Sequence, residues 1–506
     1  MTTAPGAVAA MAVLGAAGCL PVLCLVGVRW FSIPLCPLAG AVVASLSATC
    51  CLAIGATTMT WFVVLSAVGA AASLAWWWRR PDRRPWAATD AGPGAPGHRT
   101  VALVAALSVF GAVAWCLHSL SSPTIGFDTR AIWLLRAGWL LEPHHRLVLD
   151  MREVGKVLPQ ASYPPLVSAA GSVAWFVTGD HSMRLGVVVI ALLNSCALAA
   201  AALAVAEYGR QGAARLWQAA ADGGTDGSAA AAVLPAVVGA VVAVCLVFVT
   251  FGVAEPFLTN GYADPMWSLA AVGATAYGLQ AAGGRSTLGA AALLVVAAGM
   301  SKEEGEATAL FLLVLLVARA LRSAVTEGRR WWRPVLAGLA GLVLVGAWPA
   351  AVARLHIPPQ PGGPRQGSYV TRARQAVDGL APHLHVVLLA GALALAGWLV
   401  LIPVRRAIGL GHDLWAWAAL LAGQAVIVSA YVTGTISVPF WLITTAHRVT
   451  EYAALAAWWL IAAWAVTAAA APGYARWCWP ERPAAVVQPA AAPDPEPAAA
   501  MQAFRS

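Results

Sequence analysis

Carboxylates and cations stand beside apolar runs at several points of this chain, and their types and spacing indicate acid–base and anion-binding chemistry. The chain is 60% hydrophobic and 10% charged, so an ionised side chain next to a membrane-like segment is costly unless it has a use. Asp128 stands in "GFDTRAIWLLRA" and Asp264 in "GYADP", each at the start of a predicted apolar helix. Two such carboxylates at one depth could bind a divalent cation, or divide general-base and positioning roles between them.

Each aspartate also has an ordinary structural interpretation. Asp128 could cap a helix predicted over 129–141, and Asp264, which precedes a proline, could cap the next span. The helix over 129–141 carries Trp and Leu side chains typical of a membrane interface, where Arg130 and Arg136 would reach lipid headgroups or phosphates. The residues alone leave both interpretations open.

Lys302 stands among acids in "SKEEGE" (301–306), next to Glu303 and Glu304. Its ammonium group is a compact charge suited to a phosphate. The alternative is a solvated loop in which Gly305 allows a tight turn.

Arg448 directly follows His447 in "TTAHRVTE" (444–451). Its guanidinium fork could bind a phosphate. The alternative is an ion pair between Arg448 and Glu451 along one helical turn.

The elements that must position these residues are membrane spans. Mean hydropathy is +0.74, and apolar runs of span length recur along the chain, which predicts an all-helical polytopic membrane protein. The run 164–178 is too short for an ordinary span and begins with two prolines, so a juxtamembrane or re-entrant helix is expected there. About 13 spans are predicted: 6–28, 36–56, 57–78, 100–119, 184–206, 232–252, 264–282, 286–300, 306–323, 334–353, 385–403, 414–434 and 449–470.

Charge assigns the two sides of this topology. The whole net charge of +9 falls on one face, as the positive-inside rule expects for the cytoplasmic face of a plasma (inner) membrane. The long loops 120–183 and 354–384, and the polar segments above, then lie on the extracytoplasmic face. The basic balance thus reports topology and does not indicate nucleic acid. Residues 1–99 are expected to hold extra spans and a basic loop, 100–470 the catalytic core, and 471–506 a disordered Ala/Pro-rich cytoplasmic tail.

The order and membrane side of these motifs resemble the GT-C superfamily of integral-membrane glycosyltransferases, especially its actinobacterial and related bacterial branches. The resemblance rests on "GFD…IWLLRA" (126–137), "YPPL" (163–166), "GYADP" (261–265) and "SKEEG" (301–305), and covers roughly residues 100–450. It implies an enzyme that moves a sugar from a polyprenyl-phosphate donor to a glycan, lipid or protein acceptor. No nucleic-acid partner is expected.

The resemblance also implies residue roles. Asp128 takes the place of the catalytic first-loop acid, and Asp264 that of a second acid that helps to bind metal or substrate. The first loop holds one Asp and no Asp-x-Asp pair, so a Mg, Mn or Ca ion on Asp128 and Asp264 is left open. Lys302 and Arg448 match basic positions that could hold the donor phosphate. Apart from the resemblance, Arg372 in the outer loop 354–384 is a second-choice partner of that phosphate, and further substrate contacts are expected from Arg130, Tyr163, Tyr262, Glu303, Glu304 and His447.

A transporter or lipid flippase is the alternative, since many spans with charged residues can line a path. Transport predicts acids and bases near the middle of spans, whereas the charged residues of this sequence gather at predicted span ends. The sequence therefore favours the glycosyltransferase.

Overall fold

The computed structural model describes most of the chain, and every regular element in that part is a helix. The described residues are 3–79, 125–153, 160–222, 229–254, 258–280, 285–357 without 327 and 329, 367–400, 413–434 and 436–478. The predicted span 100–119 and residues 479–506 of the predicted tail lie outside them. The prediction of an all-helical fold is therefore confirmed in the described part of the chain.

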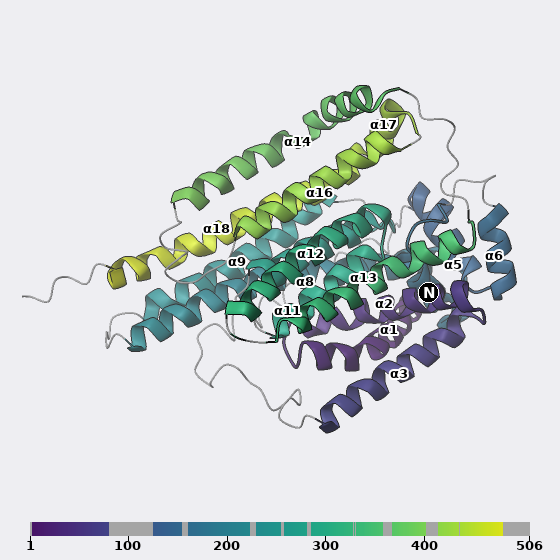
Figure 1. Cartoon of the computed structure of the whole chain (residues 1–506), viewed down its shortest axis with the longest axis horizontal. Coiled ribbons are helices and arrows are strands. Elements are labelled where there is room, and N and C mark those ends of the chain that lie inside the picture. Colours follow the sequence, from purple (N-terminus) through teal and green to yellow (C-terminus); the bar gives the residue numbers. More distant parts are fainter. Residues whose placement is uncertain are drawn as a thin grey trace, which may run out of the picture.

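The helices form one elongated bundle (Figure 1). They are α1 (Thr3–Leu25), α2 (Ser32–Ile54), α3 (Thr58–Arg79), η2 (Thr129–Leu134), α5 (Leu135–Trp139), α6 (His144–Glu153), α7 (Leu166–Thr178), α8 (Met183–Asp222), α9 (Ala229–Ala254), α10 (Asp264–Thr275), η4 (Ala276–Gln280), α11 (Arg285–Gly299), α12 (Glu303–Thr326), α13 (Trp332–Arg354), α14 (Tyr369–Val400), α16 (Asp413–Thr433), α17 (Val438–Val449) and α18 (Glu451–Cys478).

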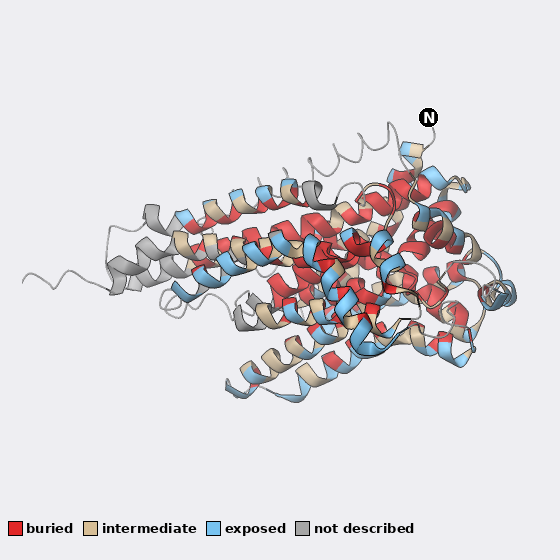
Figure 2. Ribbon diagram, turned by 90° about the horizontal axis from the view of Figure 1, so that it is seen from above, coloured by how far each residue is buried: buried red, intermediate tan, exposed pale blue. Residues whose placement is uncertain are grey.

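Buried residues lie at the centre of the bundle and exposed residues gather at its periphery (Figure 2). α8 packs against α1, α2, α7, α9, α10 and α18, and most of its apolar length is enclosed, as expected for a helix that is hydrophobic all round. In contrast, Val63 and Val68 of α3 and Leu339 and Val343 of α13 are exposed. Exposed apolar faces of this kind are the surfaces that a bilayer covers.

Six described helices are long and apolar enough to cross a membrane, namely α1, α2, α3, residues 183–214 of α8, α12 and α13. A seventh is obtained if the two parts of α14, which meet at 71°, count as one span. The described residues thus contain several helices long and apolar enough for the predicted multi-pass membrane protein, although these are fewer than the about 13 predicted spans. Helices α9, α10, α11, α16 and α18 coincide with further predicted spans.

Two predicted boundaries are wrong because helices extend into predicted loops. α14 begins at Tyr369, so part of the predicted long loop 354–384 is helical. α18 continues to Cys478, past the predicted start of the tail at residue 471. The cause is that apolar runs mark the membrane-embedded part of a helix, while a helix also continues through polar residues.

The short helix α7 begins and ends against the same end of the bundle. The backbone N–H of Leu166 donates to the carbonyl of Met300, just after α11. At its other end, Thr178 lies against Gly6 of α1. The start of α1 and the end of α11 lie at one end of the bundle, which is the arrangement expected of a juxtamembrane or re-entrant helix.

Site-directed labelling tests this path of the chain. In a cysteine-free background, Glu153→Cys at the end of α6 and Met183→Cys at the start of α8 should react with a membrane-impermeant maleimide from the same side if α7 does not cross the membrane. Thr326→Cys at the end of α12 is the control and should label from the opposite side. Labelling of the positions 153 and 183 from opposite sides would mean that α7 crosses.

Candidate functional site

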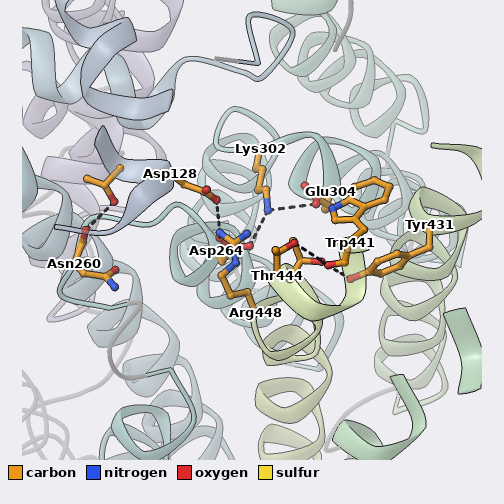
Figure 3. A network of polar contacts seen from close by, with 11 residues as sticks. Asp128, Asn260, Asp264, Lys302, Glu304, Tyr431, Trp441, Thr444 and Arg448 are labelled. Atoms are coloured by element: carbon orange, nitrogen blue, oxygen red, sulfur yellow. Dashed lines mark hydrogen bonds and ion pairs between the residues drawn. The ribbon is translucent and has the colours of Figure 1, made fainter. Parts of the chain in front are cut away.

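The structure brings the two aspartates and two of the cations from the polar segments into contact (Figure 3). Nη1 of Arg448 donates to Oδ2 of Asp128 and lies 3.5 Å from Oδ2 of Asp264. Nζ of Lys302 donates to Oδ1 of Asp264 at 2.8 Å. Two oxygens that contact one nitrogen lie no more than roughly 6 Å apart, so the carboxylates of Asp128 and Asp264 are neighbours.

Glu304 joins them through Lys302, with Oε1 3.3 Å from Nζ. We call Asp128, Asp264, Lys302, Glu304 and Arg448 the charged network. The side chain of Asp264 is 1% exposed and those of Lys302 and Arg448 are 5% and 9% exposed, whereas that of Asp128 is 22% exposed. A ligand can therefore reach Asp128 most directly, while Asp264 is enclosed with the cations that it holds.

All members of the network stand at or next to helix ends. Asp128 precedes η2, Asp264 is the first residue of α10, and Lys302 precedes α12. Arg448 is in the last turn of α17. The positive end of a helix dipole favours a carboxylate and the negative end favours a cation. The ends of α10 and α17 therefore reinforce the charges of Asp264 and Arg448, whereas Lys302, before the positive end of α12, depends on its carboxylate partners.

The loop before η2 is fixed to the loop before α10. The carbonyl of Asn260 accepts from Thr129 Oγ1 at 2.7 Å and from the N–H of Gly126 at 3.3 Å. A Cβ at Gly126 would lie 2.2 Å from the ring of Tyr262, so only glycine allows this ring so close to the backbone. The motifs "GFD" and "GYADP" are therefore interdependent.

Sequence reasoning missed Asn194, which holds this second loop from inside α8. Its Nδ2 donates to the carbonyls of Leu258 and Tyr262, each at 3.2 Å. Asn194 is fully buried, and a buried amide persists in an apolar helix because its hydrogen bonds offset desolvation. A lone Asn within the predicted span 184–206 is the signal that could have identified it.

Two tyrosines form aromatic walls beside the cations. The guanidinium of Arg448 lies 4.7 Å from the centre of the Tyr262 ring, and Nζ of Lys302 lies 6.0 Å from that of Tyr163. Tyr163 in turn stacks on Trp133, with ring centres 5.6 Å apart. Both cation–ring distances are in the range in which a ring face attracts a cation. Tyr163 and Tyr262, which were expected to contact the substrate, thus lie beside the cations of the charged network.

Two groups outside the spans have pKa values that fix their protonation. Burial lowers the pKa of Lys302, but the carboxylates of Asp264 and Glu304 outweigh it and the net shift is upward. Burial, followed by the carboxylate of Asp128, raises the pKa of Tyr262. Lys302 therefore stays an ammonium and Tyr262 a neutral phenol at physiological pH.

The structural alternatives for these motifs are wrong in three respects. Asp128 makes no side-chain capping bond to η2, because its carboxylate is paired with Arg448. The segment around Lys302 is not a solvated loop, since Lys302 and Glu304 are buried. Gly305 lies inside α12, where a Cβ would be 2.3 Å from the carbonyl of Ala298. It allows close helix packing and not a tight turn.

The proposed pair of Arg448 and Glu451 is also wrong. Arg448 is engaged with the two aspartates, whereas Glu451 is 1% exposed and neither of its carboxyl oxygens has a hydrogen-bond partner among the described residues. Arg136, expected to reach headgroups, is buried and donates to the carbonyls of Gln160 and Tyr163. Both predictions were drawn from neighbouring residues in the sequence, whereas the actual partners of these arginines lie farther away along the chain.

Arg372 is not part of the network, contrary to its assignment to the donor phosphate. It is 1% exposed, and its guanidinium donates to the carbonyls of Tyr431, Val432 and Ile436 at 2.6 to 3.1 Å. These carbonyls lie at the end of α16 and just beyond it. Arg372 therefore satisfies acceptors that a helix end leaves open.

The other predicted substrate residues lie around the network. Arg130 is exposed. Glu303 is also exposed and lines a groove of about 470 Å³ between α12 and α13, together with Glu306. His447 is exposed and its ring meets that of His383 edge-on, with centres 4.3 Å apart. None of these three predicted residues forms an ion pair with the network in the described part of the chain.

The residues present do not fit a resident divalent cation on Asp128 and Asp264. The described residues contain no group of three or more His, Cys, Asp or Glu placed to hold a metal. Both carboxylates already contact Arg448, and Asp264 also contacts Lys302. A divalent ion between them would stand against an ammonium and a guanidinium group, which supply the counter-charge themselves.

Comparison of the chain with protein-family models, with curated proteins and with solved structures finds no match. The geometry of the site is therefore the basis for any assignment of function.

A double-mutant cycle tests the buried pair of Lys302 and Asp264. Lys302→Met should lower the free energy of unfolding by about 3 kcal/mol, because it leaves a buried carboxylate with less counter-charge. Asp264→Asn alone should also destabilise, and the double variant should lose less than the sum of the two. Denaturant unfolding in detergent micelles measures all three.

The exposed Arg374 gives the matched control, since its Nε lies 3.8 Å from Asp378 and the side chain is 85% exposed. Arg374→Met should change the unfolding free energy by less than about 0.5 kcal/mol. Strict additivity of the Lys302 and Asp264 variants would show that the pair is not coupled.

Proposed function

We propose that the chain is an integral-membrane glycosyltransferase of the GT-C type, with about 13 spans and its site on the extracytoplasmic face. It moves a sugar from a polyprenyl-phosphate donor to a glycan, lipid or protein acceptor. The observation that carries the proposal is the contact of Arg448 with both Asp128 and Asp264 at one end of the bundle. Acid, base and anion-binding groups thus meet where a lipid phosphate resides.

In this proposal Asp128 is the general base. It is the most exposed carboxylate among the ion pairs of the network, so an acceptor hydroxyl can reach it. The acceptor oxygen attacks the anomeric carbon, its proton passes to Asp128, and the bond from that carbon to the phosphate oxygen breaks. A positioned base of this kind contributes typically ~10²–10⁴-fold to the rate.

Lys302 and Arg448 would stabilise the departing polyprenyl phosphate. Nε of Arg448 is a buried donor without a hydrogen-bond partner among the described residues, so a phosphate oxygen that enters the site would satisfy it. Preorganised cations in a water-poor site lower the energy of the negative charge that develops on the leaving group. Asp264 is a positioning residue, because it holds both cations and is itself enclosed.

Sugar transfer is favoured over transport by the location of the charges. Asp264 and Lys302 stand at helix starts and Arg448 in the last turn of α17. A transport path would instead need ionisable groups along the middle of spans. The network suits a reaction at the lipid–water boundary.

A transfer assay with the variant Asp128→Asn tests the proposed function. Membranes containing wild-type protein should transfer label from one of a panel of radiolabelled polyprenyl-phosphate sugars. Asp128→Asn should reduce the rate ~10²–10⁴-fold, because the amide cannot take the proton. The exposed Asp378→Asn is the control and should retain the wild-type rate.

Normal turnover of Asp128→Asn would exclude Asp128 as the base. Movement of label across the membrane without a new glycosidic bond would favour the transporter over the glycosyltransferase.

A further inference from the structure

Glu451 is a buried carboxylate next to the charged network that the proposed reaction leaves without a role. It is the first residue of α18 and is 1% exposed. Both of its carboxyl oxygens are buried and lack a hydrogen-bond partner among the described residues. Burying an ionised carboxylate without a hydrogen-bond partner costs much free energy, and binding a proton removes the charge that causes this cost.

The cations near Glu451 are already in use. Among the described residues, the charged groups that act on it are Asp264 of α10, Lys302 before α12, and Arg448 of α17. Lys302 is paired with Asp264 and Glu304, and Arg448 is shared by Asp264 and Asp128. Three carboxylates thus share two cations before Glu451 is counted.

An ionised Glu451 would be a fourth carboxylate against two cations. Its repulsion from Asp264 acts in surroundings that water does not screen, where like charges interact strongly. Binding a proton removes both this repulsion and the cost of burying an unpaired charge. Neither oxygen has a hydrogen-bond partner among the described residues. Burial without such a partner costs a neutral acid less free energy than it costs a carboxylate.

We infer that Glu451 holds a proton and that this neutral acid is part of the anion-binding site. With Glu451 neutral, an anionic headgroup that reaches Lys302 and Arg448 competes with three carboxylates; with Glu451 ionised, it competes with four. The affinity for an anion should therefore fall when the proton is lost. The identity of the anion as a lipid phosphate rests on the proposed function, whereas the proton on Glu451 does not.

The same charge balance distinguishes two kinds of lipid phosphate. A phosphodiester, such as a polyprenyl-phosphate sugar, carries a single negative charge. A phosphomonoester, such as the polyprenyl phosphate released by the reaction, loses a second proton with a pKa of about 6. A site with an excess of carboxylates therefore prefers the phosphodiester substrate and disfavours the doubly charged product.

Binding of a synthetic phosphodiester, farnesyl methyl phosphate, to the full-length protein in detergent tests the inference. This probe stays singly charged, so its own titration does not enter the measurement. As the pH is raised from acidic to alkaline, wild-type affinity should fall about tenfold once Glu451 ionises. Glu451→Gln, which imitates the neutral acid, should bind with constant affinity over the same range.

Glu304→Gln is the matched control. It removes a carboxylate that contacts Lys302 but leaves Glu451 in place, so its affinity should still fall with pH. If Glu451→Gln keeps the wild-type pH dependence, or folds but binds at no pH, the inference is overturned.

An infrared measurement without any ligand separates this inference from the proposed function. The carbonyl band of a protonated carboxylic acid should be present in the wild-type spectrum and lost in Glu451→Gln. If the two spectra agree in this region, Glu451 is ionised and the inference fails. If the band is lost but farnesyl methyl phosphate does not bind to the wild type, Glu451 carries its proton and it is the lipid-phosphate site that fails.

Discussion

The contact of one guanidinium group with two carboxylates is the interaction on which the site depends. Arg448 is separated by 320 residues from Asp128 and by 184 from Asp264. To bring them together, α17 must end where α10 begins, and the loop before η2 must reach both. The carbonyl of Asn260 fixes the loop before η2 through Thr129, and Asn194 fixes the loop before α10.

The charged network is stable only when each of its buried charges has enough partners. Each buried charge costs more to leave alone than it gains from one partner, so Asp264 needs Lys302 as well as Arg448. Close packing has the same all-or-none character, because Gly126 and Gly305 sit where any side chain would collide with Tyr262 or Ala298. The rigid helix ends position the charged side chains. The need to pair these charges in turn restricts which residues can stand at the helix ends.

The sequence predicts the parts of this structure that depend on composition. Long apolar runs identify the helices, and the cost of a charge near lipid marks Asp128, Asp264, Lys302 and Arg448 as unusual. The sequence does not predict which charge pairs with which. Local spacing offers an ion pair of Arg448 with the nearby Glu451, and Arg372 is assigned to a phosphate. Pairing depends on the convergence of distant helix ends, which neither periodicity nor spacing reports. The number of spans likewise depends on how helices bend and end, as α14 shows.

On the proposed function, the pairing of Asp128 with Arg448 also couples the two halves of the reaction. While Oδ2 of Asp128 accepts from Arg448, that oxygen is not free to take a proton from the acceptor hydroxyl. A donor phosphate must compete for that same guanidinium group. When it succeeds, one negative charge replaces another beside Arg448, and an oxygen of Asp128 is released toward the acceptor. The base would therefore become effective only in the presence of the donor, and the enclosed Asp264 would keep Lys302 and Arg448 in place while the exchange occurs.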